Sequence, residues 1–274
     1  MLGKLMKYEF RSSMGRIGIA WGAMLGMAII AGVFSRIGLM KIAGNGSSLA
    51  WVLSLLEGIS MFLYVSLVVA AIVVTVMMII SRFKRGLLGD EGYLMHTLPV
   101  SKTELIASKG LVAAIILLGS MLAISLSITL MNSIINKAQV VQNIKAFFEP
   151  FAHEPIGIIV FIEGMILFVA CLLIVIYKVY LAMSIAQLSD DHRGLIAIGA
   201  YFGINIAIAI LGTIVGILTV KLSIGTWVVE LIKRNVIYTQ INLVALMAFI
   251  VLAIVLVILH VATERILSNK LNLQ

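Results

Sequence analysis

Residues 156–177, IGIIVFIEGMILFVACLLIVIY, form an apolar stretch with a single charged side chain, Glu163. A helix needs about 20 apolar residues to cross the hydrocarbon core of a bilayer, so this stretch predicts a transmembrane helix. Five other stretches have a similar length and character. The six predicted spans are residues 17–35, 59–81, 110–135, 156–177, 195–220 and 240–262. We therefore expect an all-α membrane protein with six transmembrane helices.

The composition of the whole chain favours the same class. Of its 274 residues, 62% are hydrophobic and 12% are charged, and the mean hydropathy is +1.17. A soluble domain has about 45–50% apolar and about 25% charged residues, so this chain has too few polar side chains to cover a water-exposed surface. The long apolar runs exclude an outer-membrane β-barrel, because barrel strands alternate between apolar and polar residues.

Metal and nucleic-acid sites are not expected. The single cysteine, Cys171, lies in an apolar run and allows neither a disulfide within the chain nor a cysteine metal site. The four histidines are scattered without the spacing of metal ligands. The net charge is +8, but the basic residues flank the apolar stretches, as orientation signals do, so we expect no binding of nucleic acid.

The lysines and arginines predict the orientation in the membrane. Thirteen fall on the side that holds the N-terminus and seven on the opposite side, together the 20 of the chain. Because basic residues are enriched on the cytoplasmic side, both termini are predicted to be cytoplasmic. The connecting segments are too short for a globular domain, and the chain contains no phosphate-binding G-x-x-x-x-G-K-[ST] motif. Any hydrolysis of ATP must then come from another chain.

The N-terminal segment, residues 1–16, has the pattern of an amphipathic helix that lies in the membrane interface, against lipid. One face carries Leu2, Leu5, Met6, Phe10 and Met14, and the opposite face carries Lys4, Lys7 and Arg11. Glu9 falls between apolar residues. Its carboxylate either faces protein or pairs with neighbours along the helix surface, and the sequence favours neither alternative.

The predicted inner loop, residues 82–109, has a pattern too regular for a simple connection. Asp90 and Glu91 suit the start of a short helix, because acidic groups complement the positive end of the helix dipole. Pro99 would end that helix, and Ser101 with Glu104 forms the capping box of the next one. The short helix would carry the apolar residues Tyr93, Leu94, Met95 and Leu98. This apolar cluster either binds a partner or packs against the ends of the chain's own spans.

The stretch GDEGYLMHTLPVSKTELIASKGL, residues 89–111, resembles the loop after the second span in ATP-binding-cassette permeases of the type-2 exporter class. The matching positions are Leu98, Pro99, Val100, Ser101, Lys102, Glu104 and Lys109. The opening LMKYEFRSSM, residues 5–14, resembles the N-terminal elbow helix of that family, with Glu9 and Phe10 inside it. In layout the resemblance covers the whole chain. It is strongest to the stand-alone permease subunits of Gram-positive bacteria, which lack a fused nucleotide-binding domain.

The resemblance implies a multi-pass permease of the bacterial plasma membrane, in which two permease chains assemble with two ATP-binding subunits. ATP and Mg²⁺ would bind to the partner subunit, and this chain would hold no cofactor and catalyse no reaction. The implied ATPase-coupling residues are Asp90, Glu91, Tyr93, Leu94, Met95, Leu98 and Pro99. The second permease chain would be identical or a paralogue, and the substrate would be a peptide, a lipid or an amphiphilic drug.

The turn at residues 190–193 is either a minor ATPase contact or a solvated turn.

Polar and small residues mark positions inside the predicted spans. Glu163 and Asn205 are intramembrane polar groups, with either a transport role or a structural role between helices. For His260, near the end of the sixth span, no special role is expected. The glycines Gly18, Gly22, Gly26, Gly199 and Gly203 have the four-residue spacing of close helix packing. That packing is either within the chain or between two chains.

Two outer segments are predicted to lie at or in the membrane surface. Residues 221–239 are apolar but too short to span, which favours a re-entrant or interfacial segment. Residues 136–155, with three phenylalanines, are expected to lie on the membrane.

Two alternative functions are a secondary transporter or channel, and a membrane enzyme. A secondary transporter would need an inverted repeat, and an enzyme would need a group of polar side chains at one depth in the membrane. Neither pattern is evident in the sequence.

Overall fold

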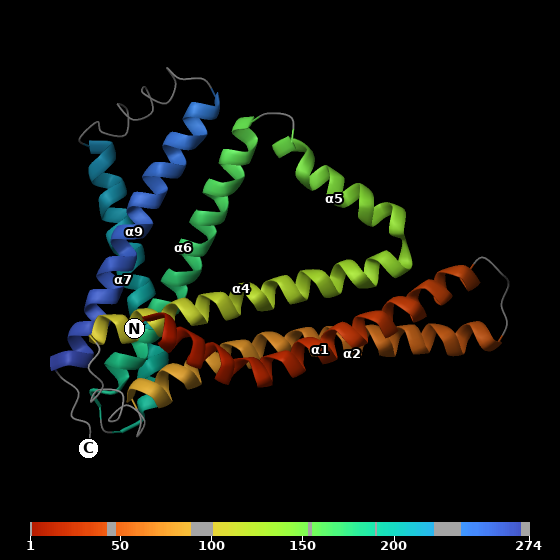
Figure 1. Ribbon diagram of the computed structural model, residues 1–274, viewed down its shortest axis with the longest axis horizontal. Coiled ribbons are helices and arrows are strands. Elements are labelled where there is room, and N and C mark those ends of the chain that lie inside the picture. Colours follow the sequence, from red (N-terminus) through yellow and green to blue (C-terminus); the bar gives the residue numbers. More distant parts are fainter. Residues whose placement is uncertain are drawn as a thin grey trace. The chain divides into compact units, whose positions relative to one another are not determined.

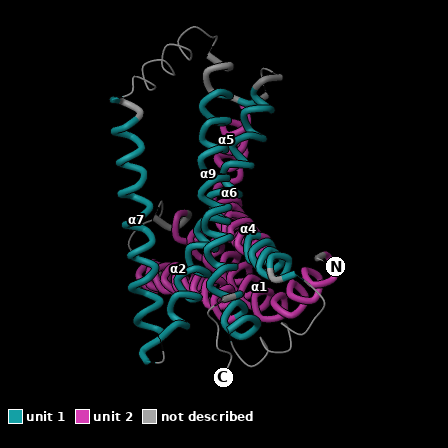
Figure 2. The backbone as a smooth tube through the Cα atoms, turned by 90° about the vertical axis from the view of Figure 1, so that its left-hand side faces the viewer, with its two compact units in different colours: residues 1–2, 82–114, 151–274 teal, residues 3–81, 115–150 magenta. Residues whose placement is uncertain are grey.

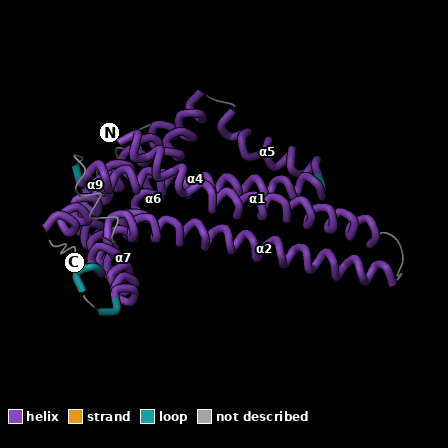
Figure 3. The backbone as a smooth tube through the Cα atoms, turned by 60° about the horizontal axis from the view of Figure 1, so that its bottom comes forward, coloured by secondary structure: helices purple, strands orange, loops and turns teal. Residues whose placement is uncertain are grey.

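The computed structural model describes residues 2–42, 48–88, 101–152, 155–189, 191–221 and 237–269. These residues are helical apart from short connections, and no strand occurs among them (Figure 3). The helices are α1 (Leu2–Ile42), α2 (Ser48–Phe83), the π-helical turn η1 (Lys84–Leu88), α4 (Lys102–Ile135), α5 (Lys137–Ala152), α6 (Pro155–Ala186), α7 (Arg193–Lys221) and α9 (Ile237–Asn269) (Figure 1).

Six of these helices are long and apolar enough to cross a membrane, which confirms the predicted all-α fold with six membrane-spanning helices. The qualifying segments are Gly3–Leu39, Ala50–Leu88, Thr103–Ile135, Gly157–Ala186, Arg193–Leu218 and Asn242–Ser268. Each predicted span lies inside one helix. The pattern of apolar residues therefore predicts correctly where these six long apolar helices lie.

The helix ends extend beyond the predicted spans. α1 is helical from Leu2, as expected for residues 1–16, but it continues through residue 17 without a break, so the N-terminal segment is not a separate element. No proline interrupts α1, and a glycine such as Gly15 costs a helix only about 1 kcal/mol. α2 begins at Ser48, eleven residues before the predicted start at 59, because the stretch before Glu57 consists mainly of good helix formers.

The structure describes both ends of the predicted inner loop. α2 continues through η1 to Leu88, where Gly86, Leu87 and Leu88 are buried, so the helix extends past the end of the predicted span at residue 81. At the other end, the backbone N–H of Glu104 donates a hydrogen bond to Ser101 Oγ (3.3 Å), as the capping box predicts. The predicted coupling residues fall at 89–100 and lie outside the described residues, as does most of the outer segment 221–239.

The chain forms two compact units, which are coloured in Figure 2. Unit 1 comprises residues 1–2, 82–114 and 151–274, and unit 2 comprises residues 3–81 and 115–150. α4 contributes its beginning to unit 1 and its remainder to unit 2. Within unit 1, α6 packs against both α7 and α9.

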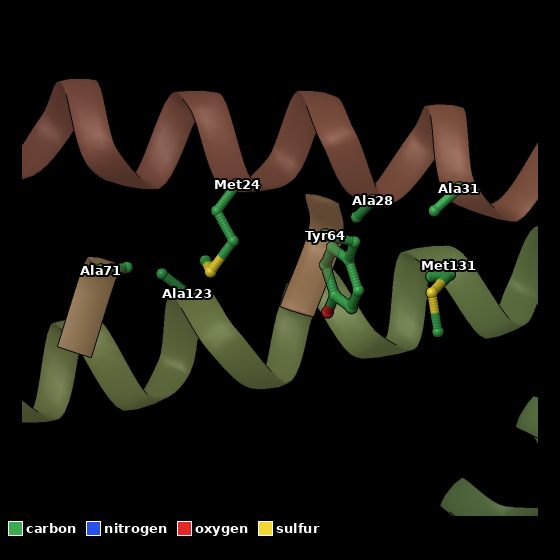
Figure 4. Close-up of a cluster of buried hydrophobic side chains, with 7 residues drawn as sticks. All are labelled: Met24, Ala28, Ala31, Tyr64, Ala71, Ala123 and Met131. Atoms are coloured by element: carbon green, nitrogen blue, oxygen red, sulfur yellow. The ribbon is translucent and has the colours of Figure 1, made fainter. Parts of the chain in front are cut away.

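The core of unit 2 consists of small and flexible apolar side chains from three helices. Its members are Met24, Ala28 and Ala31 of α1, Tyr64 and Ala71 of α2, and Ala123 and Met131 of α4 (Figure 4). A Cβ on Gly32 would lie 3.0 Å from the carbonyl oxygen of Met131, and one on Gly119 would lie 2.8 Å from the ring of Trp21. These two glycines therefore allow α1 and α4 to approach closely.

Hydrogen bonds between helices accompany this apolar core. Trp21 Nε1 donates to Ser120 Oγ (3.2 Å), and Ser120 Oγ also lies 2.9 Å from Thr75 Oγ1. The hydroxyls of Tyr64 and Ser127 are 2.9 Å apart and buried. In a bilayer the lipid chains are as apolar as leucine, so close packing and such hydrogen bonds hold the helices together.

Among the described residues, the predicted packing glycines have no close neighbour. Gly18, Gly22, Gly26, Gly199 and Gly203 are exposed, and no described atom lies within 4 Å of a Cβ built on any of them. Packing within the chain and packing between two chains both stay predictions for these glycines.

Candidate functional site at the loop-bearing end of unit 1

The last third of α6 with the residue after it, residues 177–187, contacts four other segments of unit 1, and we refer to it as the α6 hub. The segment combines aromatic residues with Lys178 and Gln187. Tyr177, Tyr180 and Ser184 are buried. It meets the end of α2 with η1, the beginning of α4, and the helices α7 and α9. The hub is therefore the place where the ends of the predicted coupling loop meet the rest of unit 1.

Both stems of segment 89–100 are attached to the α6 hub. On the α2 side, the buried ring of Phe83 stacks on Tyr180, with 3.9 Å between the ring centroids, and Gln187 Nε2 donates to the carbonyl oxygen of Leu88 (3.4 Å). On the α4 side, Tyr180 Oη donates to the carbonyl oxygen of Lys109 (3.3 Å). Tyr180 therefore contacts both stems with a single side chain.

Two glycines make room for these contacts. A Cβ on Gly110 would lie 2.9 Å from Tyr177 Oη, and a Cβ on Gly86 would overlap the Lys109 ammonium group. The Lys109 side chain is itself only 5% exposed. Gly86 therefore leaves space for the Lys109 side chain at the start of α4, and Gly110 leaves space for the Tyr177 ring of α6.

Two adjacent residues of the hub bond to two different helices. Tyr177 Oη lies 3.1 Å from His260 Nδ1 of α9, with the two rings 5.3 Å apart. Lys178 Nζ donates to Asn205 Oδ1 of α7 (3.0 Å). With 3.6 residues per turn, consecutive side chains point about 100° apart, so one helix reaches two neighbours from adjacent positions. The hub thus connects the loop stems to both α7 and α9.

The other predicted site residues with described side chains belong to segments outside the hub. Glu9 and Phe10 are half-buried in α1 of unit 2. Glu163 is half-buried in α6 and interacts with another residue. Of the turn at residues 190–193, the three described residues are exposed, and Arg193 Nε donates to the carbonyl oxygen of Ser189 (3.1 Å). The solvated-turn alternative fits these observations.

The sequence prediction missed Tyr177, Lys178, Tyr180 and His260 as a group. The sequence pattern places Lys178 in a loop because its charge ends the apolar run, whereas α6 continues to Ala186. The apolar run after Lys178, VYLAMSIA, is the available signal for the longer helix. His260 contacts Tyr177, 83 residues away in sequence, and the prediction that it has no special role stays a prediction.

The described residues include no group of three or more His, Cys, Asp or Glu side chains that could hold a metal ion. Comparisons of this chain with protein-family models, with characterised proteins and with solved structures found no match.

Proposed function

We propose that this chain is the permease subunit of an ATP-driven exporter in a bacterial plasma membrane. The observation that carries the proposal is the attachment of both stems of segment 89–100 to the α6 hub through Tyr180 and Gln187. A loop whose two stems meet on one membrane helix suits the transmission of force from a bound partner. The resemblance of residues 89–111 to the coupling loop of type-2 permeases supports the same function.

In this proposal an ATP-binding subunit binds residues 90–99 and holds ATP and Mg²⁺. Closure of that subunit displaces the loop, and the Phe83–Tyr180 stack and the Leu88–Gln187 hydrogen bond carry the displacement to α6. From the hub it reaches α9 through Tyr177 and α7 through Lys178. The buried, close-packed stems favour movement as a rigid piece, because packed interiors transmit strain.

The proposed topology has both termini and the hub on the cytoplasmic side. Hydrogen bonds join segment 82–109 to the end of α6, so two of the predicted inner loops start from the same end of unit 1, as this topology requires. The first four turns of α1 take the place of the elbow helix. α5 and residues 221–239 lie on the outer side, with the apolar face of α5 against lipid.

A second permease chain completes the proposed transport path. Within one chain, residues 209–218 of α7 are exposed, although α7 is apolar along its length. Its glycines and those of α1 leave helix faces on which a second copy or a paralogue can pack closely. The peptide, lipid or amphiphilic drug would then cross between the chains.

Copurification tests the proposed partner. The chain is expressed with the ATP-binding subunit encoded by an adjacent gene, and the membrane-extracted complex is isolated through a tag on the permease. We expect Tyr93→Asp with Leu94→Asp to abolish copurification, because the two carboxylates replace apolar anchors. The control, Gln142→Asp, places a carboxylate at an exposed position of α5, outside the predicted inner loops, and should leave the complex intact. Retention of the ATP-binding subunit by the double variant would contradict the proposal.

A further inference from the structure

Lys178 brings a positive charge into an apolar part of unit 1. It lies eight residues before the end of α6, and its partner Asn205 lies twelve residues after the start of α7. At a rise of about 1.5 Å per residue, these positions are about 12 Å and about 18 Å from the respective helix ends. Both residues fall within helices that can cross a membrane.

The ammonium group has one hydrogen-bond partner, and that partner is uncharged. Lys178 Nζ donates to Asn205 Oδ1, and no other hydrogen bond or ion pair of Lys178 occurs in the described part of the chain. The amide nitrogen of Asn205 donates to the carbonyl oxygen of Tyr201 (2.7 Å), which keeps the amide oxygen turned toward Lys178. An ammonium group has three donors, so two donors of Lys178 remain for another acceptor.

The half-buried Lys178 ammonium group can bind an anion through these two donors. A charged side chain within a membrane helix costs free energy unless it is paired, and such residues mark ligand pathways or ion pairs. The Asn205 amide supplies a dipole but no negative charge. A phosphate or carboxylate would supply the charge and accept the two remaining N–H groups in charge-assisted hydrogen bonds.

The surroundings of this pair suit an acyl chain beside the anion. On α6, Val175 lies one turn from Lys178 and is exposed; on α7, Ile198 and Phe202 lie within two turns of Asn205 and are also exposed. All three are apolar, and their exposed fractions are 45%, 58% and 61%. A ligand that enters from the bilayer can therefore place its head at Lys178 and its chain along these residues.

We propose that Lys178 and Asn205 bind the anionic headgroup of a membrane amphiphile, with a phosphate or carboxylate on Lys178 Nζ and the acyl chain along Val175, Ile198 and Phe202. The identification of the amphiphile as a transported molecule rests on the proposed export function. Binding itself involves α6 and α7 of this chain alone. A negative result would therefore leave the copurification test of the ATP-binding subunit unaffected.

The test measures binding of dioctanoyl phosphatidylglycerol to the purified full-length chain in dodecyl maltoside by isothermal titration. We expect saturable binding that weakens about tenfold or more in Lys178→Gln, because a hydrogen-bonded ion pair is lost. Lys178→Arg keeps the charge and should keep binding. Asn205→Asp should lose binding as Lys178→Gln does, since an internal carboxylate then neutralises Lys178. The control Lys221→Gln removes an exposed charge from the far end of α7 and should bind as the wild type does.

Three results would overturn the assignment. Equal affinity for phosphatidylglycerol in the wild type, Lys178→Gln and Asn205→Asp would exclude Lys178 as the site. Equal affinity of the wild type for dioctanoyl phosphatidylcholine would exclude selection of an anion. Displacement of the lipid by an equal concentration of inorganic phosphate would assign the site to a soluble anion instead of an amphiphile. Size-exclusion profiles check the fold, and if Lys178→Gln fails to fold, Lys178→Arg and Asn205→Asp decide the outcome.

Discussion

The ring of Phe83 stacks on the ring of Tyr180, with 3.9 Å between the centroids and 14° between the planes. The two residues are 97 positions apart and belong to the last turn of α2 and the last third of α6. The Tyr180 hydroxyl continues the contact to the Lys109 carbonyl, so one side chain links the two stems of the predicted coupling loop. Aromatic pairs of this kind contribute about 0.5–1.5 kcal/mol beyond the burial of their area.

Gly110→Ala should destabilise the hub. The new Cβ would lie 2.9 Å from Tyr177 Oη, and moving the phenol away would break its contact with His260. We expect a loss of about 1–3 kcal/mol, as for other overpacked sites. Reversible unfolding in mixed detergent measures it. The control Gly22→Ala has open space around the new Cβ and should be neutral or stabilising, because alanine is the better helix former. Equal effects of the two substitutions would contradict the close contact.

A double-mutant cycle measures the hydrogen bond between Tyr64 and Ser127 in unit 2. Tyr64→Phe and Ser127→Ala each remove one of the two buried hydroxyls, which are 2.9 Å apart. We expect a coupling energy of about 0.6 kcal/mol, and at most about 1.7 kcal/mol, as found for interhelical hydrogen bonds in membranes. The pair Ser54 and Tyr64 serves as the control, because the Ser54 hydroxyl bonds within its own helix turn. A coupling of zero for Tyr64 and Ser127 would show that the bond does not form.

The apolar face of α5 should lie in the outer membrane interface. Val141, Ile144, Phe147 and Phe148 are all exposed in the structure, and polar residues occupy the opposite side of this helix. In a Cys171→Ala background, an environment-sensitive fluorophore on Phe147→Cys should emit at shorter wavelength in vesicles and be quenched by brominated lipid. The same fluorophore on Gln142→Cys, on the polar side, should be exposed to water. Identical spectra at the two positions would contradict the interfacial placement.

The spans can be predicted from the sequence, but their ends cannot. A run of about 20 apolar residues dictates a membrane helix by its local composition alone, so each of the six spans falls inside a helix of the structure. Where a helix ends depends on the residues beyond the bilayer. α2 starts at Ser48 and α6 continues past Lys178, because nothing in those flanks breaks a helix.

Contacts between distant residues are beyond sequence reasoning. The four-residue spacing of Gly18, Gly22 and Gly26 shows that one helix face lacks side chains at these positions. It does not show whether a neighbouring helix packs on that face. The glycines that allow close approach, Gly110 and Gly119, do not belong to that pattern. Asn205 stands out in the sequence as an intramembrane polar group. Its hydrogen bond with Lys178, however, depends on the packing of α6 against α7, and no local sequence pattern predicts that packing.

The most direct test of the proposed function is whether ATP moves α7 through the hub. Spin labels are placed on Leu211→Cys, an exposed position of α7, in a Cys171→Ala background, and the label-to-label distance between two permease chains is measured in the complex with its ATP-binding subunit. We predict that ATP with Mg²⁺ changes this distance when Tyr180 is present. In Tyr180→Leu, which removes the stack on Phe83 and the bond to Lys109, the subunit should remain bound but the distance should stay constant. An equal ATP-induced change in both proteins, or none in either, would contradict coupling through the hub.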